Sequence, residues 1–553
     1  MDATTALTAL PAAAILVSAL LTLPVSLWLL WLYRRATLRG MLASSESAQQ
    51  RVVEPTPGAT DHDSRLDVIH WMESSPPPAS ESGHALYRRV RRAQDAVSLA
   101  CLSGGFAYAL IMALAWMITA GGGFPPGRFL WLLACYLWPA VIALYLVRST
   151  GVGTLRRLAG IYFLLVASCI LFVMIRNPDT SIGQLVYFWV FANLPATLIF
   201  LSFLYYRIRA VGPLVLAFML AGVTGAIVLV QIMGGDDALL RTYASLGSRL
   251  GMGATSLFLL LHLAGFIAFA IAGWFLLQWL GRRYRRKQLS DQTLMLDALF
   301  LAFGMVQSVT LAFEGWYWVF TGLVAFALYK LVTTLLLAGL SNRETADDAP
   351  MLLSLRVFAL GRRSERFFDN FSRLWRYTGS ISMIAGPDLV ASAIEPHEFL
   401  EFVSGRLSRR FVKDRQDLDR RVDSMDREAD PDGRYRVAEF FCHDDTWRMT
   451  MQCLADESDA ILMDLRSFSE HNRGCLYELE QLIDRVDLSR VVFLVDETTD
   501  MSFLGQWIDR LWAQMAVDSP NRQTTQPAIQ FFHLQSQSAR EFRLLLAVLA
   551  RSM

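Results

Sequence analysis

The chain has 553 residues, of which 54% are hydrophobic and 18% are charged, and its formal net charge is +1. A typical soluble domain has about 25% charged residues, so this composition excludes an ordinary globular protein. The nearly neutral charge balance gives no indication of a nucleic-acid partner. Long apolar runs are concentrated in residues 12–33 and 96–340, whereas residues 340–553 have the composition of a soluble domain.

Nine apolar segments are long enough to cross a lipid bilayer. The hydrocarbon core is about 30 Å thick, and an α-helix needs about 20 residues to span it. We therefore predict an α-helical polytopic membrane domain over residues 1–340, with about nine transmembrane helices. The predicted spans lie near residues 12–33, 96–119, 129–147, 158–175, 185–206, 210–233, 254–280, 293–314 and 317–339.

The basic residues of the connecting loops predict the orientation. If the amino terminus is outside, the inside loops are residues 34–95, 148–157, 207–209 and 281–292. They hold 19 Lys and Arg residues, whereas the outside loops hold 4. Lys and Arg are enriched in cytoplasmic loops. We expect a protein of the inner (plasma) membrane with its amino terminus outside and its carboxyl-terminal domain in the cytoplasm.

The loop at residues 34–95 is the longest predicted connection. It contains PTPGATDHD (55–63) and SSPPPASESG (74–83), which have too few apolar residues to bury a core. We therefore expect a largely disordered cytoplasmic loop. It ends in the basic run YRRVRRAQ (87–94), which suits contact with anionic lipid headgroups.

Few ionisable residues fall inside the predicted spans, and they include His262, Asp297 and Lys330. Such residues are functional candidates because their desolvation is costly. Asp297 and Lys330 lie in consecutive spans and could pair, which favours a structural ion pair. No matching pair of Gly- or Pro-broken spans occurs, so an anchor or a sensor is favoured over a transporter.

Residues 345–553 predict a cytoplasmic α/β domain. Short apolar segments alternate with amphipathic helical segments, which indicates a parallel sheet covered by helices on both faces. We expect a doubly wound, flavodoxin-like domain in which the charged segment near 411–433 is a solvated insertion. The predicted strands are residues 351–358, 380–386, 434–443, 460–465, 491–496 and 528–534.

The stretch DAILMDLRSFSEHNRGCLYELEQLI (459–483) predicts a buried strand, a polar loop and an amphipathic helix. Ligands of open parallel sheets bind at the carboxyl ends of the strands, where this loop and helix start lie. Helical periodicity places Glu478 near the helix start, half buried at the margin of the apolar stripe. Glu478 is therefore a candidate catalytic carboxylate, although an acid at a helix start also favours the helix dipole.

The segment Cys475–Leu479, CLYEL, resembles the C-x-x-E-L end of the S-x-W-C-x-x-E-L signature of TIR (Toll/interleukin-receptor) domains. Over roughly residues 350–553 the chain looks like bacterial membrane-attached proteins with a TIR-like or nucleoside-deoxyribosyltransferase-like domain. The resemblance implies that Glu478 acts on the ribose of NAD or a nucleoside, with NAD as substrate, no cofactor, and a homo-oligomeric protein. Gly474 stands where the family has an aromatic residue, and many TIR domains serve only as assembly modules.

Three further residues are candidates for binding a nucleotide. Arg356, at the end of the first predicted strand, could hold a phosphate with two hydrogen bonds. Asp464 is a second carboxylate near a strand end, and Ser467 lies in the following loop. A surface ion pair for Arg356 and a loop cap for Asp464 are the structural alternatives. The run His443–Asp445 does not predict a metal site, because adjacent residues cannot all face one ion.

Three functions are compatible with the sequence. The first is a membrane-anchored enzyme that cleaves the N-glycosidic bond of NAD or a related nucleotide, as an effector in stress or defence. The second is a noncatalytic signalling module that self-associates through its TIR-like domain. The third is a transporter or channel with a regulatory tail. All three place the protein in a lipid bilayer.

Overall fold

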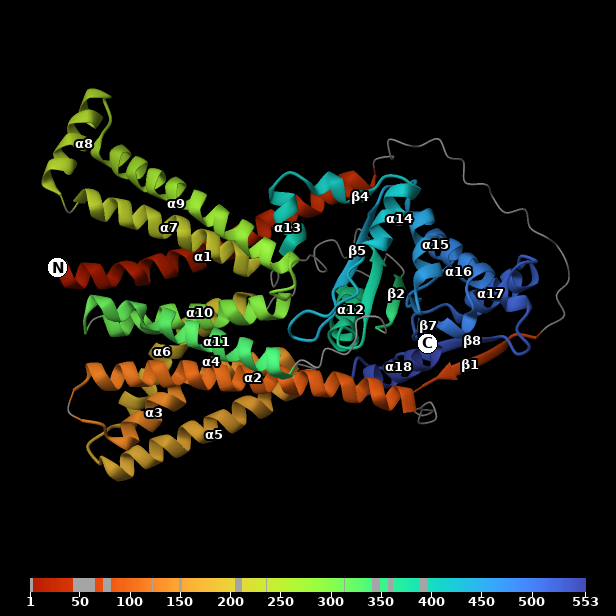
Figure 1. Ribbon diagram of the computed structural model, residues 1–553, viewed down its shortest axis with the longest axis horizontal. Coiled ribbons are helices and arrows are strands. Elements are labelled where there is room, and N and C mark those ends of the chain that lie inside the picture. Colours follow the sequence, from red (N-terminus) through yellow and green to blue (C-terminus); the bar gives the residue numbers. More distant parts are fainter. Residues whose placement is uncertain are drawn as a thin grey trace. The chain divides into compact units, whose positions relative to one another are not determined.

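The computed structural model describes residues 3–42, 65–72, 81–121, 123–148, 152–203, 211–234, 236–312, 314–340, 349–356, 362–386 and 396–553. The chain forms two compact units (Figure 1). The helical unit comprises Met1–Leu32, Ala96–Leu340 and Ile394–Val403, and the sheet unit comprises Tyr33–Asp95, Ser341–Ala393 and Ser404–Met553. The segment 33–95 is thus grouped with the sheet unit, and the helix at 396–403 with the helical unit.

Within the described residues, eight helical segments are long and apolar enough to cross a membrane. They lie in α2 (Glu81–Thr119), α3 (Pro126–Tyr136) with α4 (Trp138–Arg148), α5 (Val152–Arg176), α6 (Ile182–Phe203), α7 (Gly212–Gly234), α9 (Ala254–Arg285), α10 (Asp291–Ala312) and α11 (Thr321–Leu340). Shorter helices are α8 (Asp237–Arg249) and α13 (Pro396–Val403). These segments agree with a polytopic membrane domain. The first predicted span lies in α1 (Ala3–Met41), and the total of nine and the orientation stay predictions.

Several polar side chains inside these helices are paired with one another. The Lys330 ammonium of α11 lies 2.5 Å from the Asp297 carboxylate of α10, as the sequence suggested. Tyr108 of α2 donates a hydrogen bond of 2.6 Å to Gln307 of α10, and Gln307 donates one of 3.2 Å to Asn193 of α6. Pairing offsets the cost of desolvating polar groups, so these residues have a structural explanation.

In the described residues of the sheet unit, eight parallel strands lie in the order β1-β8-β7-β6-β2-β3-β5-β4. The strands are β1 (Asp67–Trp71), β2 (Met351–Arg356), β3 (Ser380–Ile384), β4 (Phe411–Val412), β5 (Val437–Cys442), β6 (Ala460–Asp464), β7 (Val491–Val495) and β8 (Ala528–His533). All of the predicted strands are present. Their nearly continuous apolar sequences reflect burial on both faces, which is typical of parallel sheets.

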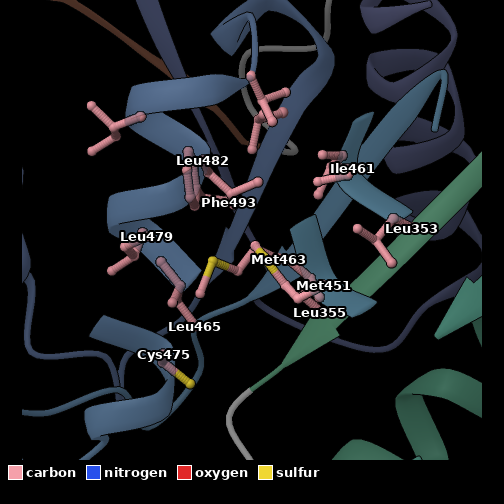
Figure 2. Close-up of a cluster of buried hydrophobic side chains, with 14 of the residues drawn as sticks. Leu353, Leu355, Met451, Ile461, Met463, Leu465, Cys475, Leu479, Leu482 and Phe493 are labelled. Atoms are coloured by element: carbon pink, nitrogen blue, oxygen red, sulfur yellow. The ribbon is translucent and has the colours of Figure 1, made fainter. Parts of the chain in front are cut away.

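Helices cover both faces of the sheet. They are α12 (Arg362–Trp375), α14 (Arg415–Asp423), α15 (Trp447–Glu457), α16 (Arg473–Arg485), α17 (Met501–Ala513) and α18 (Ala539–Ser552). Successive strand residues point to opposite faces. Leu353 and Ile461 therefore pack with α15 and α16 on one face (Figure 2). Residues of α17 belong to the same cluster. Their neighbours Leu352 and Leu462 pack with α12 and α18 on the other face.

The sheet does not have the flavodoxin-like strand order that we expected. Without β1 and the short β4, the strands numbered along the chain lie in the order 3-2-1-4-5-6. This is the doubly wound order of dinucleotide-binding sheets, whereas flavodoxin-like sheets have the order 2-1-3-4-5. The difference arises because β5 pairs with β3, so the chain crosses to the other half of the sheet only after β5. The switch point therefore lies between β2 and β6.

Part of the loop that was expected to be disordered is a strand. β1 pairs in parallel with β8, from Asp67 opposite Ala528 to Trp71 opposite Phe532. The Trp71 side chain packs against the core and donates a hydrogen bond of 3.2 Å to Gln530. The sequence DVIHW is rich in strand-favouring residues. Its backbone N–H and C=O groups form hydrogen bonds with the edge of β8. The stretch PTPGATDHD and residues 74–80 of the second polar stretch lie outside the described residues.

The charged insertion is structured as well. It contains β4 and α14, and Leu418 and Val422 of α14 are buried in the core. Arg436 contacts the Asp430 carboxylate at 2.8 to 3.1 Å, and the Asp430 side chain is fully buried. Most of its charged side chains are exposed, as expected of a solvated insertion, but the segment also contributes buried residues to the core. Two apolar residues four positions apart are enough to bury one face of this short, highly charged helix.

Candidate functional site

The carboxyl ends of β2 and β6 lie side by side at the switch point, where open α/β sheets bind their ligands. Arg356 is the last residue of β2 and Asp464 is the last residue of β6, and the two are register partners. The structure thus brings together two residues that the sequence singled out separately. Arg356 is only 5% exposed, so its alternative interpretation as a surface ion pair is wrong.

Helix α16 carries Glu478 to the same switch point. The helix begins at Arg473, directly after the polar loop that follows β6. The Cys475 sulfur lies 3.7 Å from the backbone oxygen of Arg356, which fixes the first turn of α16 against the end of β2. Glu478 follows about one turn later, and its side chain is only 2% exposed.

Glu478 belongs to the buried side of α16 and not to its margin. The buried residues of the helix are Cys475, Glu478, Leu479, Gln481, Leu482 and Ile483. Leu476 of the same helix is partly exposed, and the contact of Cys475 with β2 sets this rotation of the helix. Glu478 is therefore an interior residue beyond the first turn. This burial excludes the alternative that Glu478 is an exposed acid whose role is to interact favourably with the helix dipole.

The carboxyl group of Glu478 is in an unusual electrostatic setting. Its Oε2 atom is buried and makes no hydrogen bond to any residue that the structure describes. Burial raises the pKa of Glu478 to about 8, although the positive charge of Arg356 acts in the opposite direction. A buried polar atom without a partner costs about 1–3 kcal/mol. A strongly shifted carboxyl pKa at a ligand-binding edge is typical of functional sites.

Asp464 binds a residue that the sequence analysis did not single out. Arg466 donates from Nε and Nη2 to the two carboxylate oxygens of Asp464, at 2.7 and 2.6 Å. The backbone N–H of Arg466 also donates to Asp464, which is the loop cap that the sequence allowed as an alternative. The Arg466 side chain is fully buried, with its guanidinium 4.5 Å from the ring centre of Phe367. Asp464 therefore positions Arg466 and the start of the loop.

Ser467 lies in a strained turn beside the end of β7. Its φ angle is 57°, a left-handed conformation that residues other than glycine rarely adopt. Its hydroxyl lies 3.0 Å from that of Thr498, which donates a hydrogen bond of 2.6 Å to Asp496. The guanidinium of Arg363, at the start of α12, binds Asp496 at 2.6 Å and is 43% exposed. Strained loops of this kind cluster at functional sites.

Sequence reasoning missed Arg363, Asp496 and Thr498. The signal was present, because Asp496 follows the apolar strand VVFLV in the same way that Asp464 ends AILMD. Parallel strands end at the same edge, so both acids had to lie at the ligand-binding side of the sheet. Arg363 had no comparable signal, since only the fold brings the start of α12 to the end of β7.

Among the residues that the structure describes, metal ligands do not converge at this edge. In the described part of the chain, no group of three or more His, Cys, Asp or Glu side chains is arranged to hold a metal ion. In the run His443–Asp445, the His443 ring lies 2.8 Å from the backbone oxygen of Gly40 and stacks on Phe411. These contacts give His443 a structural role.

The fold and the site define the class of the protein. It combines a polytopic helical unit with a doubly wound parallel sheet, and the switch point of that sheet holds a buried acid. No protein-family model, curated protein or solved structure matches the chain. The functional assignment therefore depends on the chemistry of the switch point.

Proposed function

We propose that the protein is a membrane-anchored enzyme that cleaves the N-glycosidic bond of NAD or a related nucleotide, with Glu478 as its catalytic carboxylate. One observation carries the proposal. The Glu478 carboxyl is buried beside Arg356 at the switch point, and its Oε2 has no hydrogen bond among the described residues. A buried carboxyl group that lowers the stability of the fold is typical of a site that acts on a ligand. The resemblance of CLYEL to the TIR signature supports the same residue.

The reaction breaks the bond between C1′ of the ribose and the nitrogen of the base. The base leaves with the electron pair, and positive charge develops on the ribose, as in glycoside cleavage. The ionised carboxylate of Glu478 stabilises or attacks C1′. Water then adds to C1′ and releases its proton through the carboxylate to solvent. For NAD the products are nicotinamide, ADP-ribose and a proton, and no cofactor is consumed.

Substrate charge assists this chemistry. Glu478 must be ionised to act on C1′, and a cationic nicotinamide ring beside it lowers the carboxyl pKa, as Arg356 already does in part. Arg363 is a suitable partner for the anionic diphosphate, because its guanidinium is half exposed at the start of α12. Ser467 and Asp464 hold the loop between these two regions.

In this proposal the helical unit anchors the enzyme in the inner membrane with the sheet unit in the cytoplasm, and homo-oligomers form there. The main alternative is a noncatalytic signalling module that uses the same sheet only for assembly. A transporter or channel with a regulatory tail is the second alternative. The paired Asp297 and Lys330 in the described helices are explained by structure, which favours an anchor.

The test uses the full-length chain in proteoliposomes at high protein density, with nicotinamide release from NAD as the readout. We expect release by the wild-type chain and a loss of about 100-fold or more in Glu478→Gln, because positioned acid–base groups contribute about 10²–10⁴-fold. Glu480→Gln is the matched control, since this acid lies on the same helix but is only partly buried. Turnover that survives Glu478→Gln contradicts the proposal, as does a folded wild-type chain without turnover of NAD or related nucleotides.

A further inference from the structure

Two histidines from distant parts of the chain meet at the outer edge of the sheet. His70 lies in β1 opposite Phe531 of β8, so its side chain shares a face with Phe531 and with His533 two residues further on. The Nδ1 atom of His70 and the Nε2 atom of His533 share a hydrogen bond of 2.7 Å, in which either ring can be the donor, and the ring centres are 5.0 Å apart. His70 is exposed and His533 is partly buried, so solvent reaches the pair.

Neighbouring contacts hold the two rings in place. The His70 ring stacks on Phe531, with ring centres 5.6 Å apart and planes 21° from parallel. On the opposite face of β1, the Trp71 indole is fixed by Gln530 and lies under the guanidinium of Arg551, 5.3 Å from the ring centre. Because β1 is anchored through Trp71, the position of His70 does not depend on its contact with His533.

We propose that His70 and His533 form a binding site for a borderline divalent metal ion of the zinc type, with water in the remaining coordination positions. Neutral imidazole nitrogens are strong ligands for such ions. Two nitrogens on one tetrahedral zinc ion lie about 3.3 Å apart, given zinc–nitrogen bonds of about 2.0–2.1 Å. Zinc binding must therefore replace the hydrogen bond between the two rings: the two nitrogens move apart by about half an ångström, and the rings turn so that both lone pairs point at the ion, which rotation of the exposed His70 side chain permits.

This site is independent of the proposed catalytic site and has a structural consequence. Its two ligands are 463 positions apart in the chain, and one of them lies in the segment between the first two helices. A metal ion bound to both would hold β1 on β8. Binding to the paired strands but not to the separated ones stabilises the pairing by mass action. The metal would thus tie the segment around Asp67–Trp71 to the sheet.

The test measures zinc binding to the full-length chain in detergent, purified without a polyhistidine tag and freed of metal. We expect zinc to bind to the wild type and to slow amide hydrogen exchange of residues 67–71. His70→Ala and His533→Ala each lose a direct ligand, so zinc affinity falls by at least about 10-fold. His471→Ala is the matched control, because the His471 side chain is 83% exposed in another loop.

A second substitution distinguishes the loss of a zinc ligand from a folding defect. His533→Cys keeps a zinc ligand at the same position, so we expect it to bind zinc where His533→Ala does not. Three results overturn the proposal: a wild type that binds no zinc, equal zinc affinity in the wild type and His70→Ala, or amide exchange of residues 67–71 that zinc leaves unchanged in the wild type.

Discussion

The fold changes the protonation of Glu478 strongly. Its carboxyl pKa is about 8 in the folded chain, against about 4.3 for an exposed glutamate. Between these values the folded state holds a proton that the unfolded state has released, so stability falls as pH rises through this window. Below about pH 4 both states are protonated and the cost vanishes. At pH 7 the cost is roughly 3 kcal/mol.

Replacing Glu478 by glutamine removes this titration. We expect Glu478→Gln to raise the free energy of unfolding by up to roughly 3 kcal/mol at pH 7. The gain should shrink as pH approaches 4. Chemical denaturation of wild type and variant at several pH values measures both effects. If Glu478→Gln destabilises the chain at pH 7, the charged carboxylate has a structural partner and the site assignment fails.

The same residue predicts the pH dependence of turnover. A carboxylate that acts on C1′ must be ionised, so kcat/KM for NAD should rise with pH and level off above about 8, the pKa of Glu478 in the free chain. Initial rates of nicotinamide release at subsaturating NAD measure this rise of kcat/KM with pH. A rate that falls as pH rises through the same range would identify the protonated form as the active one, and the proposed role in ionised form would be wrong.

At the scale of elements, α16 joins the core to the candidate site. Leu479 is fully buried against the sheet, next to Glu478 in sequence (Figure 2). Leu479→Asp places an unpaired charge in that core at a cost of several kcal/mol, so we expect the sheet unit to unfold. Arg485→Asp, at an exposed position of the same helix, should leave it folded. Limited proteolysis of the full chain distinguishes the two, and a protease-resistant Leu479→Asp variant would contradict the packing of α16.

β1 shows why element prediction was incomplete. Five residues, of which Val68, Ile69 and Trp71 favour strands, form a strand only because the edge of β8 is free to pair with them. Their sequence neighbourhood, rich in Pro, Ser and Asp, indicated disorder. The local sequence therefore did not predict this strand or the position of His70. The strands β2, β6 and β7 were predictable, because their continuous apolar sequences are typical of strands buried on both faces.

At the scale of the whole molecule, the distribution of basic residues predicts the topology. The inside loops hold 19 Lys and Arg residues and the outside loops 4. In a background without the 6 native cysteines, we expect a cysteine replacing Ala238 to react with an impermeant thiol reagent from outside. A cysteine replacing Thr345 should react only after the membrane is opened. The reverse pattern would show that the predicted orientation is wrong.

The sequence by itself determined the features that depend on local composition and period. Apolar runs of about 20 residues identified the membrane helices, and alternation of strands and helices identified the parallel sheet. The carboxylate Glu478 and the strand-end residue Arg356 could be named because parallel strands present their carboxyl ends at one edge. Each of these inferences needs only residues close together in the chain.

The tertiary structure alone decided the strand order, the pairing of β1 with β8, the ion pair of Asp464 with Arg466 and the full burial of Glu478. Helical periodicity gives the side chains that share a face, but the rotation of α16 is set by its contact with β2. Strand order likewise depends on which backbone edges pair across long stretches of chain. The pKa of Glu478 follows from that burial, so the property that makes it a catalytic candidate arises only when the distant elements pack.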